Sequence, residues 1–222
     1  MDWDFYGNHL IPALNDGLWI SILLILPSVS GGLLMGIVVG ALRTFGSPLL
    51  KSIGNGYAGL FRGTPLVVQL FILYFGLPNI GIYLSPYAAA ITGFILCSGA
   101  YHSEYIRGGL LSIKQGQLLA AKSLGFSSLG SIFWIILPQA MRRALHGCSN
   151  EIIYLIKYSS LAYIITCIEI TGQARDVATT YFRFTESFFV AGIYYLAIVT
   201  LAGFGLGRLE KTLYIPGFGK KN

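Results

Sequence analysis

The chain has 222 residues, of which 55% are hydrophobic and 11% are charged, and its formal net charge is +6. Soluble domains carry about 25% charged residues, and a soluble chain of this composition would leave a large apolar surface in water at a cost of roughly 25 cal/mol per Å². The composition therefore excludes an ordinary soluble domain and favours an all-α protein that crosses a bilayer several times.

Five stretches are apolar enough to cross a bilayer, whose hydrocarbon core needs roughly 20 helical residues. The stretch 63–103 contains no Lys, Arg, Asp or Glu and is too long for one crossing, but Pro78 and Pro86 divide it in two. We predict a single transmembrane domain, residues 1–222, with five transmembrane helices. The predicted spans cover residues 17–42, 63–80, 86–106, 150–170 and 187–207.

The first span carries a face of small residues. Gly32, Gly36 and Gly40 are four residues apart, which lets another helix approach the backbone closely. Gly203 and Gly207 repeat this spacing in the last span. The pattern is compatible with packing inside the chain and with a subunit interface.

The distribution of positive charge predicts the orientation. With the N-terminus outside and the C-terminus inside, twelve of the 15 Lys and Arg residues lie on the inner face, two lie outside, and Lys157 lies in the membrane. Cytoplasmic loops carry such an excess. A sixth span at 123–141 would place six of these residues outside, so we assign residues 114–143 to a cytoplasmic loop between spans three and four. This distribution also argues against a nucleic-acid partner.

The cytoplasmic loop predicts two short helices. Ala120 and Ala121 give the first helix a small-residue face, and Gly125 is expected to end it. Ser127 or Ser128 can cap the second helix, which we expect to end before Pro138. Such a helix suits insertion into a cleft of a partner, although the pattern also fits a plain surface helix.

Two charges inside the fourth span are the main candidates for contact with a solute. A charge near the bilayer centre costs several kcal/mol, so Glu151 and Lys157 are expected to face a partner or an aqueous cavity. Six residues apart, they do not share a face of a regular helix, unless a break at 158–160 brings them together. An ion pair, or side chains that reach the headgroup level, is the alternative. The expected substrate-binding residues are Gln69, Tyr74, Ser98, Glu151, Lys157, Tyr158 and Ser159.

Enzyme and metal motifs are missing from the sequence. It contains no GxxxxGK[ST] phosphate-binding loop, its three cysteines have no CxxC spacing, and its three histidines are isolated. We therefore predict that this chain is not an enzyme and holds no metal and no cofactor.

The loop resembles the cytoplasmic loop of ATP-binding-cassette importer permeases, whose pattern is E-A-A-x3-G-x9-I-x-L-P. The residues at the spacing of that pattern are Ala120, Ala121, Gly125, Ile135, Leu137 and Pro138. Leu119 stands where the family usually has Glu. Either the groove of the partner is apolar here, or a second, different permease supplies the Glu.

Other segments are similar to the polar amino-acid permeases, the family that transports histidine, glutamate, glutamine, arginine and opines. They are Leu60-Phe61-Arg62-Gly63-Thr64-Pro65, Ser98-Gly99-Ala100-Tyr101 with Glu104 and Arg107-Gly108-Gly109, and Asn150-Glu151 with Leu155-Ile156-Lys157-Tyr158-Ser159-Ser160-Leu161. The last resembles the L-x-K-D-T-S-L element of that family, with Tyr158 in place of the frequent Asp. Because this carboxylate would suit a cationic side chain, its loss implies a neutral polar amino acid such as glutamine rather than arginine or lysine.

The resemblance also implies partners and a location. In that family the loop docks on a cytoplasmic ATPase dimer, which binds ATP and Mg²⁺, and two identical or related permeases line the path. A periplasmic or lipid-anchored binding protein delivers the solute, and the complex works in the bacterial inner membrane by alternating access. The expected ATPase-coupling residues are Gln117, Leu119, Ala120, Ala121, Gly125 and Pro138. The external stretch 171–186 is expected to face the binding protein, with Arg175, Asp176, Arg183 and Glu186 as docking charges, or to be a plain solvated loop.

Two other functions remain as alternatives. An ion-coupled secondary transporter would show inverted repeats, and the sequence shows no internal repeat. A membrane assembly subunit without transport would leave Lys157 and the 114–143 loop unexplained.

Overall fold

The computed structural model describes residues 3–213, and all regular elements of this part of the chain are helices. In chain order the helices are η1 (Phe5–Leu10), α1 (Ile11–Phe45), α2 (Pro48–Gly63), α3 (Leu66–Phe71), η2 (Ile72–Gly76), η3 (Leu77–Ile80), α4 (Pro86–Leu111), α5 (Gln115–Ser123), α6 (Ser128–Ser131), η4 (Ile132–Ile136), α7 (Leu137–Tyr158), η5 (Ser159–Ile165), α8 (Ile170–Tyr181) and α9 (Phe184–Thr212).

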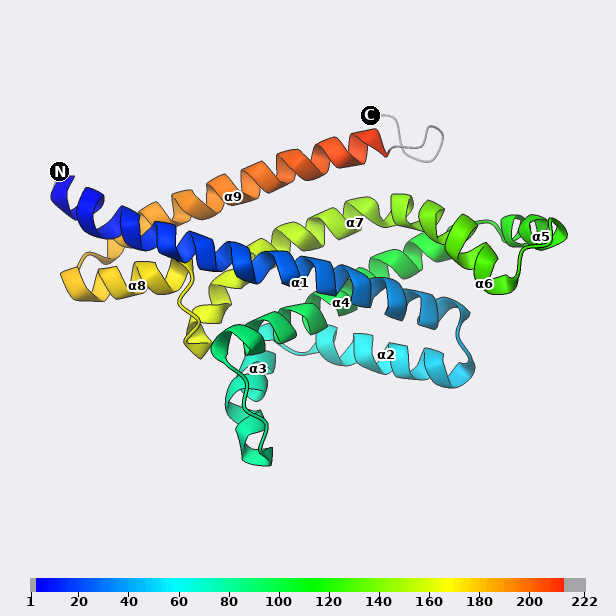
Figure 1. Ribbon diagram of the computed structural model, residues 1–222, viewed down its shortest axis with the longest axis horizontal. Coiled ribbons are helices and arrows are strands. Elements are labelled where there is room, and N and C mark those ends of the chain that lie inside the picture. The colour runs from blue at the N-terminus through cyan, green and yellow to red at the C-terminus, as the bar shows by residue number, and fades with distance from the viewer. Residues whose placement is uncertain (1–2, 214–222) are drawn as a thin grey trace.

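The long helices α1, α4, α7 and α9 run along a common direction, and α2 turns back beside α1 (Figure 1). The short helices α5 and α6 lie at one end of this bundle, whereas α8 and the start of η1 lie at the other end (Figure 1). The segment from α3 to η3 leaves the bundle at 104° to α2. We call residues 66–85 the arm.

The packing of α1 on α4 forms the centre of the molecule. A Cβ atom on Gly36 would lie 2.4 Å from Cβ of His102, and one on Gly32 would lie only 2.0 Å from Oγ of Ser98. The glycine face of the first span therefore packs within this chain. The second glycine pair differs, because a Cβ atom on Gly207 would meet nothing within 4 Å.

Two helical stretches of residues 3–213, Phe5–Phe45 and Phe184–Thr212, are long and apolar enough to cross a membrane. The number rises to four if each bent pair, Pro48–Gly63 with Leu66–Ile80 and Ser128–Ile165 with Ile170–Tyr181, forms one span. The central helix α4 is 26 residues long. It carries the polar side chains Ser98, His102 and Ser103, which lower its mean hydropathy. These side chains are buried, so protein rather than lipid surrounds them.

The helix α2 is absent from our prediction, which assigned residues 48–62 to no helix. It begins with Ser47, whose hydroxyl accepts a bond from the Leu50 N–H, and with Pro48 in the first turn. Polar residues such as Lys51 and Asn55 interrupt its sequence. A prediction based on the length of apolar stretches therefore does not find this helix. As a result, residues 63–80 are not one helix but the end of α2 followed by the arm.

The predicted helix end before Pro138 is wrong. Helical backbone continues from α6 through η4 into α7, with Pro138 in the first turn of α7. The five-residue π-helical segment η4 precedes it. A π-helical segment widens the turn there, which removes the conflict between the proline ring and the preceding carbonyl groups.

Candidate functional site

Glu151 and Lys157, the two charges that we predicted to lie in the membrane, are both on α7, and the structure does not bring them together. The helix remains regular through Lys157 and changes to the 3₁₀-helix η5 only after Tyr158, so the break follows both charges. Glu151 is 2% exposed, whereas Lys157 is exposed on another face of α7. The Lys157 ammonium lies 5.1 Å from the centre of the Tyr154 ring, and the Tyr154 and Tyr158 rings stack with centroids 6.0 Å apart.

Glu151 is a buried carboxyl group without a cationic partner in residues 3–213. Its Oε1 atom accepts no hydrogen bond from this part of the chain. The carboxyl group interacts electrostatically with Tyr101 and Tyr105 on α4 and with Tyr158 on its own helix. An unsatisfied buried polar group costs free energy, so the Glu151 carboxyl group is a candidate acceptor for a cationic or hydrogen-bond-donating ligand.

The other predicted substrate residues make contacts within the chain. The Gln69 amide donates to the carbonyl oxygens of Phe61, at 2.9 Å, and Thr64, at 3.1 Å, and thereby joins the end of α2 to the arm. Ser98 packs beneath Gly32. Ser159 donates to the Ile156 carbonyl at 2.7 Å.

Tyr74 connects the arm to the end of η5. Its hydroxyl lies 3.2 Å from Oγ1 of Thr166. Thr166 itself has a positive φ of 66°, a backbone conformation that few residues other than glycine adopt. Tyr74 therefore has a structural partner at a strained turn.

Sequence reasoning missed an ionic cluster on α1, α2 and α4, which we call the Glu104 cluster. The Glu104 carboxylate lies 2.8 Å from guanidinium nitrogens of Arg43, Arg62 and Arg107. Arg43 also donates to Ser103 at 3.1 Å. The three-residue spacing of Glu104 and Arg107 on one helix could have indicated one ion pair. The arginines on α1 and α2 come close to Glu104 only when the chain folds, so the sequence does not reveal them. One carboxylate among three guanidinium groups leaves two positive charges in excess.

The predicted coupling residues lie on and around α5 and α6, at one end of the bundle (Figure 1). Gly125 has a φ of +88° after the end of α5, and Ser127 accepts a bond from the Gly130 N–H at 3.0 Å, so both predicted caps are confirmed. Ala121 is buried against the chain, whereas Leu119 is 65% exposed.

Two further residues predicted for coupling lie at the start of α7 or contact it. The Gln139 amide nitrogen donates to Oε1 of Gln117 at 2.7 Å, and Pro138 lies in the first turn of α7. Ala120 is exposed. Of the two alanines, only Ala120 therefore contributes to the exposed surface of α5, next to Leu119.

The opposite end of the bundle is held by a buried carboxylate. The Glu169 side chain accepts from the Thr171 and Gly172 N–H groups at the start of α8, and the Tyr195 hydroxyl of α9 donates to it. The expected docking charge Arg175 lies over the Tyr163 ring, 6.0 Å from its centre, and Arg183 lies over Phe5 at 4.6 Å. Asp176 is exposed and Glu186 is half-buried. Within residues 3–213, no group of three His, Cys, Asp or Glu side chains could hold a metal ion.

Comparison with known proteins identifies relatives along nearly the whole chain. Residues 14–213 match the family model for the binding-protein-dependent transport system inner membrane component. The chain is 36% identical to the glutamine transport system permease protein GlnP of Escherichia coli K12, over 92% of this chain and 94% of that protein. It is also 36% identical to the nopaline transport system permease protein NocM of Agrobacterium fabrum, over 75% of this chain and 73% of that protein.

Solved structures share the fold. A crystal structure of an amino acid ABC transporter with histidines superposes with a TM-score of 0.81 at 28% identity, over 90% of this chain and 94% of that chain. An inward-facing structure of the MetNI methionine ABC transporter gives a TM-score of 0.79 at 18% identity, over 93% of this chain and 98% of that chain.

Proposed function

The chain belongs to the family of binding-protein-dependent transport system inner membrane components, and from this premise we propose that it carries a neutral polar amino acid such as glutamine into the cell. It is a multi-pass permease subunit of an ATP-binding-cassette importer in a bacterial inner membrane, and a separate ATPase subunit hydrolyses ATP. The observation that carries the proposed substrate class is the 36% identity to a glutamine permease over 92% of the chain.

The topology that we propose has five spans, with the N-terminus outside and the C-terminus inside. It counts α4 as a span in addition to the two apolar helices and the two bent pairs. Support comes from the positive charge of the loop that contains α5 and α6, and from the position of these helices at the end of the bundle opposite α8 (Figure 1).

The complex that we propose contains this permease, a second identical or related permease, an ATPase dimer and an external binding protein. The ATPase contacts Leu119, Ala120 and the neighbouring surface of α5, and the binding protein contacts α8. Transport requires that the solute and ATP favour different states of the complex, because a ligand shifts a conformational equilibrium only by its differential affinity.

Within this chain, Glu151 accepts the ammonium group of the solute, and the surrounding tyrosines supply hydroxyl groups. Lys157 meets the carboxylate at a second position on the path. Six residues of a helix rise about 9 Å, which exceeds the separation of the two charged groups in one amino acid. The two side chains therefore act in succession rather than on one bound molecule in a single pose.

Uptake into proteoliposomes tests the proposed substrate. The complete importer, with its binding protein and ATP, should accumulate radiolabelled glutamine, and excess unlabelled glutamine should compete better than arginine or lysine. A clear preference for arginine contradicts the proposal. ATP-independent uptake driven by an ion gradient would instead favour a secondary transporter.

A further inference from the structure

Arg62, at the end of α2, has hydrogen-bond donors that its contacts do not use. Its Nη1 atom bonds to the Glu104 carboxylate at 2.8 Å, and its guanidinium carbon lies 5.7 Å from the centre of the Tyr101 ring. A guanidinium group carries five N–H donors, so within residues 3–213 Nε and Nη2 have no hydrogen-bond partner. The Arg62 side chain is also the most exposed of the three arginines around Glu104, at 38%.

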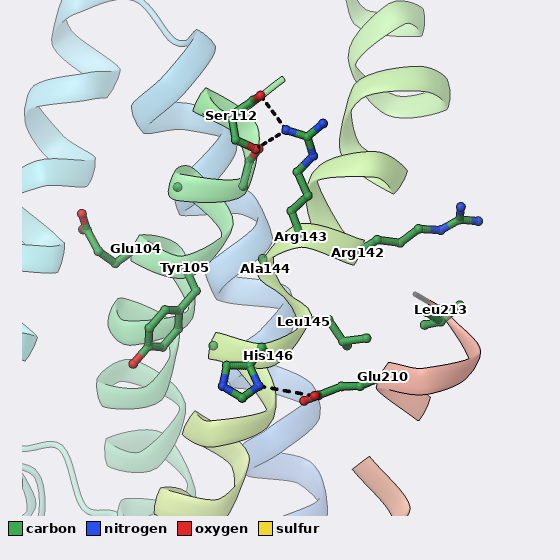
Figure 2. A pocket seen from close by; sticks show the side chains of 13 residues that line it. Glu104, Tyr105, Ser112, Arg142, Arg143, Ala144, Leu145, His146, Glu210 and Leu213 are labelled. Carbon is green, nitrogen blue, oxygen red and sulfur yellow. Dashed lines mark hydrogen bonds and ion pairs between the residues drawn. The ribbon is translucent and has the colours of Figure 1, made fainter. Parts of the chain in front are cut away.

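The Glu104 carboxylate does not neutralise Arg62. It is shared with Arg43 and Arg107, whose guanidinium nitrogens also lie 2.8 Å from its oxygens. Figure 2 shows Glu104 projecting from α4 on the side away from α7. Because one carboxylate cannot balance three guanidinium groups, the Glu104 cluster can accept the carboxylate of a small ligand at Arg62 and keep its own carboxylate in place.

The packing of α4 on α7 places Tyr101 beside Glu151. The two helices run in opposite directions (Figure 1). A Cβ atom on Gly147 of α7 would lie 2.5 Å from Cδ1 of Tyr105 on α4, so these two residues lie at the same level of the bundle. One turn before Tyr105 on α4 is Tyr101, and one turn after Gly147 on α7 is Glu151. Tyr101 and Glu151 therefore lie level with each other.

Two opposite charges meet at the same pair of tyrosines. Tyr101 and Tyr105 both interact electrostatically with Glu151 and with Arg62. Glu151 is 2% exposed, and its Oε1 atom accepts no hydrogen bond from the part of the chain that the structure describes. The ammonium and carboxylate groups of an amino acid are attached to one carbon atom. An amino acid therefore matches the acceptor on α7 and the donors on α2.

We propose that Arg62 binds the carboxylate of the solute while Glu151 binds its ammonium group, beside the Tyr101 ring. Guanidinium groups bind carboxylates through paired, charge-assisted hydrogen bonds. The inference rests on the proposed function and adds a step to it. Lys157 lies toward the end of α7, whereas Arg62 bonds to Glu104, in the opposite direction along the bundle. The solute carboxylate contacts Lys157 first and Arg62 later, as the solute moves inward.

Equilibrium binding to the detergent-purified complex of permease and ATPase tests the role of Arg62. The probes are radiolabelled L-glutamine and, as a competitor, L-glutaminamide, in which an uncharged carboxamide replaces the carboxylate. The binding protein is left out, so that its own selection between the two compounds does not enter. The unmodified complex should bind glutamine roughly tenfold or more tightly than glutaminamide, because hydrogen bonds to a charged group contribute about that factor.

Two substitutions of Arg62 separate binding from structure. Arg62→Gln should weaken glutamine binding roughly tenfold and leave the affinity for glutaminamide nearly constant, whereas a purely structural role would lower both affinities in parallel. Arg62→Lys keeps a positive charge and should retain part of the preference for glutamine. The matched control is Lys51→Gln, which removes an exposed charge near the start of the same helix and should change neither affinity.

Three results overturn the proposal. They are a parallel loss of both affinities in Arg62→Gln, an undiminished preference for glutamine in that variant, and no preference in the unmodified complex. Any of these together with normal glutamine uptake by the unmodified importer would leave the proposed transport function intact. If that importer takes up arginine instead, L-arginine and L-argininamide replace the two probes. The role of Arg62 is thus tested separately from the identity of the solute.

Discussion

Glu104 illustrates how one carboxylate can join three helices. It bonds to Arg43 of α1, Arg62 of α2 and Arg107 of its own helix. The Arg43 side chain is 8% exposed, and that of Glu104 is 29% exposed, so solvent screens the cluster only in part. Without the carboxylate, the three guanidinium groups would repel one another.

We expect Glu104→Gln to destabilise the chain by about 2 kcal/mol, less than the 3–5 kcal/mol typical of a fully buried pair because this carboxylate is partly exposed. The melting temperature of the detergent-solubilised complex measures the effect. Glu210→Gln is the matched control, since the ion pair that Glu210 makes within residues 3–213 is with the largely exposed His146. Equal melting temperatures for the two variants would contradict this account.

Glu151 is expected to act in transport rather than in folding. Glu151→Gln removes the charge that would bind the solute ammonium, and charge-assisted bonds contribute about 1.5–3 kcal/mol, so initial uptake should fall roughly tenfold or more. The melting temperature should stay constant or rise, because no charge has to be buried.

The matched control is Glu210→Gln, which changes the same functional group near the C-terminal end of α9. Its uptake should equal that of the unmodified importer. If Glu151→Gln lowered the melting temperature and uptake in parallel, the side chain would be structural.

At the residue scale, sequence reasoning identified charges but not their partners. The cost of burial predicts that Glu151 requires a special environment, whereas the exposed Lys157 shows that a charge within an apolar stretch can still face outward. Gln69 and Ser98 are candidates because they are polar within apolar stretches, but both pack within the chain. A sequence does not distinguish a polar residue that binds a ligand from one that joins helices.

The contact of α1 with α4 depends on the absence of side chains. Gly36→Val would place its Cβ atom 2.4 Å from Cβ of His102 and about 3.1 Å from the Ser103 nitrogen. Because the Ser103 nitrogen belongs to the backbone, it cannot move aside alone. We expect a loss of about 3 kcal/mol or more, measured as a lower melting temperature and a lower yield of folded protein. Gly192→Val is the control, and an equal loss there would contradict the packing argument.

The surface of α5 predicts the nature of the ATPase groove. Leu119 is 65% exposed and Leu124, just after this helix, is 79% exposed, which favours an apolar groove in the partner. Leu119→Glu should therefore weaken association with the ATPase roughly tenfold, since a charge would be buried without a partner, whereas Leu119→Met should not. Co-purification and solute-stimulated ATP hydrolysis measure the effect. Unchanged or improved coupling in Leu119→Glu would show that the groove has retained a basic residue.

At the scale of elements, the apolar stretches and the caps of α5 and α6 could be predicted, because hydropathy and capping act locally. The helix α2 could not be predicted in this way. It is amphipathic, and its apolar face is covered only when it packs against α1 and α4. The continuous helical backbone from α6 through η4 into α7 could not be predicted from the sequence either. A proline normally ends a helix unless a π-helical segment adjusts the backbone.

The whole molecule has two distinct sides. The arm projects from the bundle on the side opposite α9 (Figure 1), and its tip is irregular between Gly81, which has a φ of +83°, and Ser85. Ile80 and Tyr83 are exposed at this tip, 71% and 79% respectively. Lipid cannot satisfy the polar backbone groups of an irregular segment, so at membrane depth the arm needs a cover of protein. A second permease fits this requirement.

We therefore expect the arm to contact the second permease of the proposed complex. With a photo-crosslinking benzoylphenylalanine in place of Tyr83, irradiation of intact membranes should yield an adduct with the mass of two permeases. The same replacement of Leu196, which is exposed on α9, should yield mainly lipid adducts, because α9 lies on the opposite side of the bundle. Permease adducts from position 196 together with none from position 83 would place the interface on α9, and the glycine pair at 203 and 207 would then become its centre.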